Sequence, residues 1–103
     1  MQNKYLQVII LLSLTLVTLT NCSKFRKIQK SEDVMYKYEA SLKYYEEEDY
    51  YRASLLLEEI IPILRGRPEG EKAQFTFAYC YFYQKQYLLS AHYFKTFYTT
   101  YSR

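Results

Sequence analysis

The chain has 103 residues, of which 14 are basic and 11 acidic, with one histidine, two cysteines, two glycines and two prolines. A formal net charge of +3 is too small to indicate a nucleic-acid-binding protein, and one histidine with two cysteines gives no ligand spacing for a closed metal site. The length allows one domain at most, with a core of marginal size.

The first 21 residues resemble a bacterial lipoprotein signal peptide. Lys4 precedes an apolar segment over residues 8–19, and Leu19-Thr20-Asn21-Cys22 follows. The apolar segment fits a signal peptide and is shorter than the roughly 20 residues that a membrane-spanning helix needs. We therefore expect cleavage before Cys22 and acylation of Cys22, with this covalent lipid in place of any cofactor. An uncleaved membrane anchor is the alternative, because Asn21 stands where Gly, Ala or Ser is usual.

Residues 22–31 are expected to form the lipidated cysteine and a tether. Residues 23–30 have no acidic residue and no apolar periodicity, which indicates an extended chain just outside the membrane. Their basic residues are Lys24, Arg26, Lys27 and Lys30. These lie against anionic head groups or belong to a solvated linker, and both interpretations stay open. Without the leader the chain keeps 13 basic and 11 acidic residues, a net charge of +2.

Helices are predicted within residues 32–103. The first covers residues 33–47, where Ser31-Glu32-Asp33 offers a cap and two carboxylates, and apolar side chains recur every three or four residues. The acidic run at residues 46–49 interrupts this pattern and indicates a solvated turn rather than catalytic carboxylates. The second helix covers residues 50–64 and contains Pro62, so we expect a kink or a frayed last turn.

Residues 65–70 contain both glycines and Pro68, which predicts a loop before a third segment over residues 71–84. Aromatic residues alternate there with a period of two, which taken alone favours a strand. An internal repeat favours a helix instead, because a period in the thirties with two helices per unit indicates a helical repeat. The pairs 37 residues apart are Ser41 and Ala78, Tyr44 and Tyr81, and Tyr50 and Tyr87. A fourth helix over residues 87–98 then pairs with the third.

With these residues aligned, the chain resembles the tetratricopeptide repeat family. In that family a small residue in the first helix, a tyrosine three positions later and a Tyr-x-x-Ala unit in the second helix pack the hairpin together. The matching residues are Ser41, Tyr44 and Ala53 in a repeat over about residues 33–65, and Ala78, Tyr81 and Ser90 in a repeat over about residues 71–101. The resemblance implies an all-α fold of two helical hairpins in an α-solenoid. Glu48 and Lys85 replace the family's turn glycine.

A closer resemblance rests on four further motifs that follow the lipoprotein cysteine. They are Tyr-Tyr-Arg-Ala at residues 50–53, Pro-Ile-Leu-Arg-Gly at 62–66, Ala-Tyr-Cys-Tyr at 78–81 and Tyr-Leu-Leu-Ser-Ala-x-Tyr-Phe at 87–94. With these the chain looks like the N-terminal portion of the BamD family of outer-membrane assembly lipoproteins, in its Bacteroidetes form. The resemblance implies a non-enzymatic scaffold, lipid-anchored on the periplasmic side of the outer membrane. Its partners would be the barrel-assembly subunits and unfolded β-barrel substrates, with no nucleic acid and no small-molecule substrate.

The resemblance also implies a concave groove in which extended peptides bind. The groove positions carried over are Tyr38, Leu42, Tyr45, Lys72, Phe75, Tyr79 and Tyr83. Tyrosine offers an apolar face and a hydroxyl group, which suits barrel strands that alternate apolar and polar residues. The alternative for each of these positions is that its side chain packs in the core. A further face is expected to lie open toward another repeat or a partner. It includes Tyr93, Phe94, Phe97 and Tyr98.

Cys80 and His92 are a formal thiol and imidazole pair, but no orienting acid is apparent and a cysteine buried among aromatics is inert. No catalytic residue is therefore predicted. The alternative function is that of another envelope lipoprotein built on the same repeats, such as a surface glycan-binding subunit of a nutrient-uptake system. Such exported lipoproteins tend to carry acidic residues after the cysteine. Residues 23–26 have none, which favours the periplasmic side.

Overall fold

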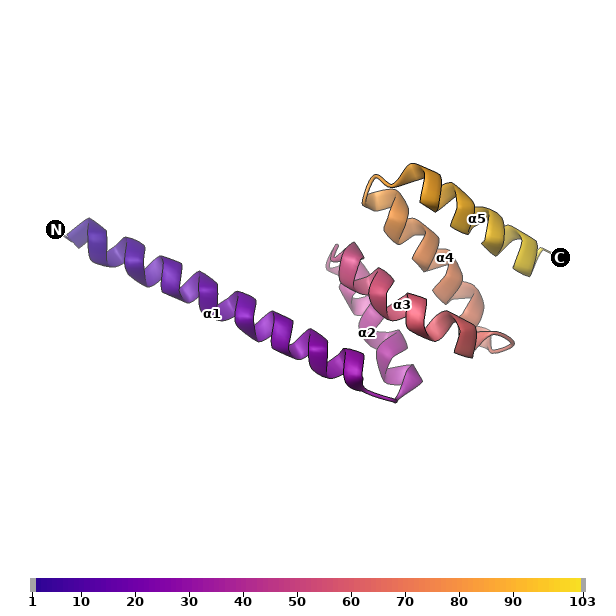
Figure 1. The fold of residues 1–103 in the computed structure, drawn as a ribbon, viewed down its shortest axis with the longest axis horizontal. Helices are drawn as coiled ribbons and strands as arrows, with labels where there is room; N and C mark the ends of the chain where they lie inside the picture. The colour runs from indigo at the N-terminus through magenta and orange to yellow at the C-terminus, as the bar shows by residue number, and fades with distance from the viewer. Residues whose placement is uncertain (1, 103) are drawn as a thin grey trace. The chain divides into compact units, whose positions relative to one another are not determined.

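The computed structural model describes residues 2–102, without the side chains of residues 2, 17 and 18. Five helices make up most of this range (Figure 1): α1 (Gln2–Lys30), α2 (Val34–Glu46), α3 (Tyr50–Leu64), α4 (Pro68–Tyr83) and α5 (Tyr87–Tyr101). No strand occurs within residues 2–102, so the predicted all-α class of helical hairpins is confirmed, even for the alternating aromatics of α4. The chain divides into two compact units, residues 1–30 and residues 31–103.

The helix α1 is continuous and therefore includes residues 23–30. The prediction of an extended tether over these residues is wrong. Residues 2–30 contain neither glycine nor proline, so nothing interrupts the helix once it has begun. The part of α1 from Asn3 to Lys30 is long and apolar enough to cross a membrane, with a mean hydropathy of 1.8 in an 18-residue stretch, and signal sequences near an N-terminus share this property.

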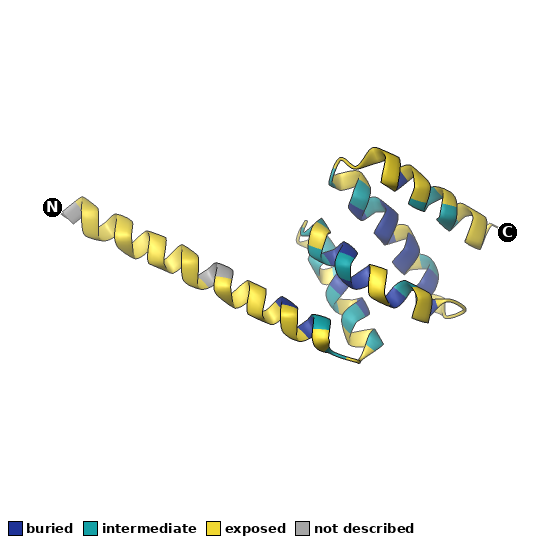
Figure 2. Ribbon diagram, in the orientation of Figure 1, coloured by how far each residue is buried: buried dark blue, intermediate teal, exposed yellow. Residues whose placement is uncertain are grey.

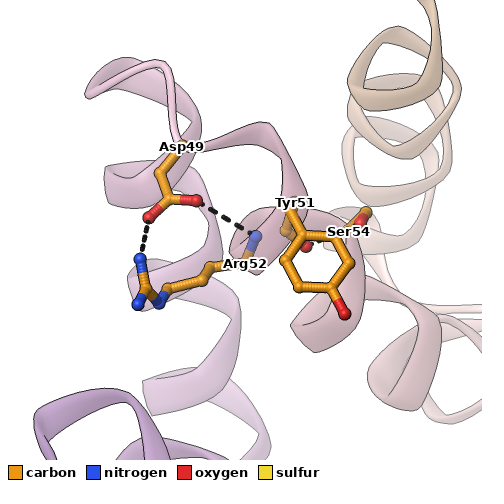
Figure 3. A network of polar contacts seen from close by, with 4 residues as sticks. All are labelled: Asp49, Tyr51, Arg52 and Ser54. Atoms are coloured by element: carbon orange, nitrogen blue, oxygen red, sulfur yellow. Dashed lines mark hydrogen bonds and ion pairs between the residues drawn. The ribbon is translucent and has the colours of Figure 1, made fainter. Parts of the chain in front are cut away.

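Aspartate side chains fix the starts of α2 and α3. The carboxylate of Asp33 accepts a hydrogen bond from the Tyr36 N–H at 3.1 Å. That of Asp49 accepts one from the Arg52 N–H at 3.2 Å, and its second oxygen lies 2.7 Å from the Arg52 guanidinium (Figure 3). One turn further, the Ser54 hydroxyl donates to the Tyr51 carbonyl at 2.7 Å (Figure 3). The two bonds from the Tyr36 and Arg52 backbone N–H groups satisfy donors that a helix start otherwise leaves without partners.

We expected a kink or a frayed last turn at Pro62; the helix α3 continues past Pro62 to Leu64, so its last turn is not frayed. Leu64 is completely buried, so packing holds the last turn in place of the hydrogen bond that proline cannot make. An ion pair also joins the two helices of the first hairpin, with Lys37 Nζ 2.8 Å from Glu59 Oε2.

Both helices of the second hairpin are longer than predicted. The helix α4 begins at Pro68, three residues before the predicted start at Glu71. Proline suits the first position of a helix, because its N–H would have no partner there and its φ is already helical. The helix α5 ends at Tyr101 instead of residue 98. Only three residues separate α3 from α4, and among them Gly66 has a φ of +82°, which glycine adopts without strain.

The two hairpin turns have the same backbone geometry. In the first turn the Asp49 N–H donates to the Tyr44 carbonyl at 2.9 Å, and the Glu48 N–H donates to the Tyr45 carbonyl at 3.1 Å. The second turn repeats both bonds 37 residues later, from Gln86 to Tyr81 and from Lys85 to Phe82, each at 3.0 Å. This is the Schellman pattern, in which the residue after the helix cap is left-handed. Glu48 and Lys85 occupy this position, and both have a φ of 63°.

In residues 31–102 each helix packs against the next one along the chain, so α3 lies between α2 and α4. Buried residues accordingly gather on α3 and α4 (Figure 2). The core cluster consists of Tyr38, Ala53, Leu57, Ile60, Leu64, Ala73, Phe77 and Cys80. The α5 residues 37 positions after Leu57, Ile60 and Leu64 are Phe94, Phe97 and Tyr101. They are only half-buried, because α5 packs mainly against α4.

Small side chains let the helices of each hairpin approach closely. In the second hairpin the Ser90 hydroxyl donates to the Ala78 carbonyl at 3.0 Å, from α5 to α4. The equivalent residues of the first hairpin, Ser41 and Ala53, are both completely buried, and the Ser41 hydroxyl donates to the Tyr38 carbonyl of its own helix at 2.6 Å. Serine and alanine are thus exchanged between the hairpins. The other two predicted packing residues, Tyr44 and Tyr81, are half-buried beside the core.

Replacing the left-handed residues by glycine should stabilise the protein. Glu48→Gly and Lys85→Gly each remove the strain of a side chain at positive φ, and each should raise the free energy of unfolding by about 0.5–1 kcal/mol in urea denaturation. Glu47→Gly is the matched control, because Glu47 has a φ of −81° and gains nothing from glycine. Equal effects at residues 47 and 48 would contradict the assigned turn.

Gly70→Ala should destabilise the domain. A Cβ atom at Gly70 would overlap the Leu64 carbonyl oxygen and lie 2.9 Å from the Tyr101 hydroxyl oxygen, so α3 and α4 would have to separate. We expect a loss of about 1–3 kcal/mol in the free energy of unfolding. Lys72→Ala, at an exposed position of the same helix, should change it by less than about 0.5 kcal/mol. Similar values for the two variants would rule out the close approach at Gly70.

Candidate protein-binding surface

Four of the seven predicted groove residues lie on one side of α4. They are Lys72, Phe75, Tyr79 and Tyr83, here called the α4 strip. Their spacing of three and four residues places them in one row along the helix. Phe75 and Tyr83 are 41% and 47% exposed, Lys72 is exposed and Tyr79 is half-buried. The strip is therefore a surface that another molecule can contact.

Aromatic rings continue this row from the second hairpin into the first. Ring centroids lie 4.9 Å apart for Phe75 and Tyr79, and 5.9 Å apart for Tyr79 and Tyr83. Tyr83 then stacks on Tyr50 of α3 at 4.8 Å, and Tyr50 meets the edge of Tyr45 from α2 at 5.5 Å. Neighbouring rings in such geometries attract each other beyond the area they bury. The row therefore spans three helices and links the two hairpins.

Side chains of α5 support the strip from one side. The rings of Phe94 and Phe97 lie 6.0 Å and 5.2 Å from that of Phe75, and Phe94 also lies 4.8 Å from Tyr79. Beside them is a shallow depression of about 400 Å³, lined by Pro68, Glu71, Lys72, Phe75 and Phe97. Phe94 and Phe97 were expected on an open face, and they instead share their contacts with the α4 strip. Tyr98 is the exposed member of that expected face, at 73%.

The first repeat contributes less to the surface than predicted. Tyr38 is only 8% exposed and belongs to the core cluster, so its assignment to the groove is wrong. It is buried because α4 packs over this part of the first hairpin. Leu42 and Tyr45 are half-buried and pack against the same core. The accessible part of the predicted groove therefore belongs mainly to α4.

Tyr50 was missed as a member of the surface, because the sequence assigned it only to the start of a helix. A signal was present, since Tyr45 and Tyr50 lie on either side of the first hairpin turn, which brings them together. Burial, and to a lesser extent the neighbouring Tyr83, raises the pKa of Tyr45 to about 12. Its hydroxyl therefore stays protonated and uncharged at neutral pH.

Cys80 is completely buried, and this burial raises the pKa of its thiol to about 12. The thiol is therefore protonated at neutral pH and is not a nucleophile in the folded protein. His92 lies on an exposed position of α5. Within residues 2–102 no three His, Cys, Asp or Glu side chains come together in a way that would hold a metal ion.

Comparison with known proteins yields no relative: no family model, no curated protein and no solved structure matches the chain significantly.

The buried thiol should make stability fall at alkaline pH. Unfolded Cys80 ionises near its ordinary pKa of 9, while the folded thiol keeps its proton to about pH 12. The folded state binds the thiol proton more tightly than the unfolded state. The resulting contribution to the free energy of unfolding is complete below pH 9 and is lost as the pH rises to 12. The thiol contributes a slope of at most about 1.4 kcal/mol per pH unit, measured by urea denaturation.

Cys80→Ala separates this effect from the ionisation of the tyrosines. Free tyrosine has a pKa of 10.0, and burial raises the pKa of Tyr38, Tyr44, Tyr45 and Tyr81 in the folded protein, so these tyrosines add to the slope above pH 9. The variant should therefore lose the thiol's share of the slope and keep the tyrosines' share. A slope equal to that of the unmodified protein would show that another group is responsible.

Proposed function

We propose that this protein is a lipid-anchored scaffold on the periplasmic side of the outer membrane, where it holds partner or substrate chains of the β-barrel assembly machinery. Binding takes place along the α4 strip and the rings of Tyr45 and Tyr50 that continue it. The single observation that carries the proposal is this aromatic row, which is accessible along α4 and spans both hairpins.

The chemistry of the row suits segments of unfolded barrels. Such strands alternate apolar and polar residues and are rich in aromatics near the membrane interfaces. Tyr79 and Tyr83 offer large apolar faces and hydroxyl groups with few rotatable bonds, so that binding restricts little additional motion. Lys72 at one end of the strip adds a positive charge that attracts a carboxylate.

The proposed location rests on the sequence. A lipoprotein-type cysteine follows the leader at residue 22, and residues 23–30 lack the acidic residues that surface-exported lipoproteins tend to carry. The assembly role rests on the resemblance of the repeat motifs to the BamD family. A glycan-binding envelope lipoprotein remains the second hypothesis.

Removing two exposed rings should abolish most of the binding. The double variant Phe75→Ala, Tyr83→Ala should bind a synthetic C-terminal barrel strand about tenfold or more weakly than the unmodified protein, as measured by fluorescence anisotropy of the labelled peptide. Tyr98→Ala is the matched control, because it removes an exposed tyrosine of α5 outside the strip. Circular dichroism and thermal unfolding would confirm that all variants keep their helices.

Equal affinities for the double variant and the control would refute the strip as the binding site. Location needs its own test, in which a protease is added to intact cells. The repeat domain should resist digestion until the outer membrane is opened. Its release from intact cells would contradict the periplasmic location and favour the glycan-binding alternative.

A further inference from the structure

We infer that the helical segment after Cys22 is a lipid-recognition surface, which lays three basic side chains against anionic phospholipid head groups on the same side as the acylated cysteine. This inference rests on the proposed acylation of Cys22. It concerns a different surface from the α4 strip and a different partner, the membrane itself.

The charges of the segment are all positive. Residues 22–30 contain four basic side chains, and residues 1–31 contain no acidic one. Arg26, Lys27 and Lys30 are all exposed. A cluster of basic residues beside a membrane anchor attracts anionic lipids, because their phosphates raise the local density of negative charge.

The helix gathers these residues around the cysteine. Since residues 23–30 are helical, Cys22, Arg26 and Lys30 lie four residues apart in a row, with Lys27 beside them. The same residues line one surface depression, which is bordered by Leu19, Cys22, Ser23, Arg26, Lys27 and Lys30. Lys24, Phe25 and Ile28 fall on the other side of the helix by the same spacing. An extended tether would have spread the charges in all directions.

The distances favour a helix that lies along the membrane. At a rise of 1.5 Å per residue, Lys30 is about 12 Å from Cys22, which exceeds the screening length of about 8 Å at physiological ionic strength. A helix standing upright on the acyl chains would leave Lys30 screened from the head groups. When the helix lies flat, all three charges fall within reach of the phosphates.

The test measures which lipids gather around the anchored protein. The acylated protein is reconstituted in phosphatidylcholine vesicles with about one-fifth phosphatidylglycerol. Because the chain has no tryptophan, Gln29→Trp serves as the only tryptophan donor for energy transfer to head-group-labelled lipids. Transfer to labelled phosphatidylglycerol should exceed transfer to labelled phosphatidylcholine, and the difference should vanish at about 1 M salt.

Charge removal from the proposed face supplies the decisive comparison. Arg26→Gln, Lys27→Gln and Lys30→Gln should each weaken the preference for phosphatidylglycerol by up to about fivefold, and the triple variant should remove it. Lys24→Gln, which deletes the same charge from the other side of the helix, should change it much less.

Two results would overturn the inference: equal transfer to both lipids, or an effect of Lys24→Gln as large as that of the other three. A mass spectrum that shows Cys22 unmodified would contradict the proposed anchoring as well. Normal acylation of Cys22 without a preference for phosphatidylglycerol would contradict this inference alone. The proposed scaffold function would not be affected.

Discussion

The close approach of two helix backbones within each hairpin is the constraint on which the rest of the repeat domain depends. At Ala78 and Ser90 the helices lie near enough for a side-chain hydroxyl of α5 to reach a carbonyl of α4. Larger side chains there would push α5 away from α4. The rings of Phe94 and Phe97 would then lose their contact with Phe75, and the α4 strip would lose its support.

The repeat offset of 37 residues predicted more of the fold than any local pattern did. It identified α4 as a helix although its aromatic residues alternate as in a strand, and the offset recurs bond for bond in the two Schellman turns. Predictions from single residues failed where the same residue type is found both in loops and in helices. Pro68 and Gly70 indicated a loop, yet proline also starts helices and Gly70 is required by packing. The absence of apolar periodicity after Cys22 indicated an extended chain, although that absence does not prevent a helix.

The candidate site was predictable only in part. Helical spacing places Lys72, Phe75, Tyr79 and Tyr83 on one side of α4, and the structure has them there. Which side of α2 faces outward depends on how α4 stacks on it, and a sequence does not state this. Tyr38 therefore lies in the core, while Tyr50 joins the surface through contacts between helices that are distant in the sequence.

The order of packing, in which each helix lies against its successor, bears on how the chain acquires its structure. Contacting residues stay close in sequence, and three-residue connections join successive helices from α2 to α5. Domains of such low contact order fold within microseconds to milliseconds. The first hairpin can close before the second has left the ribosome, so folding can proceed from the N-terminal side of the domain.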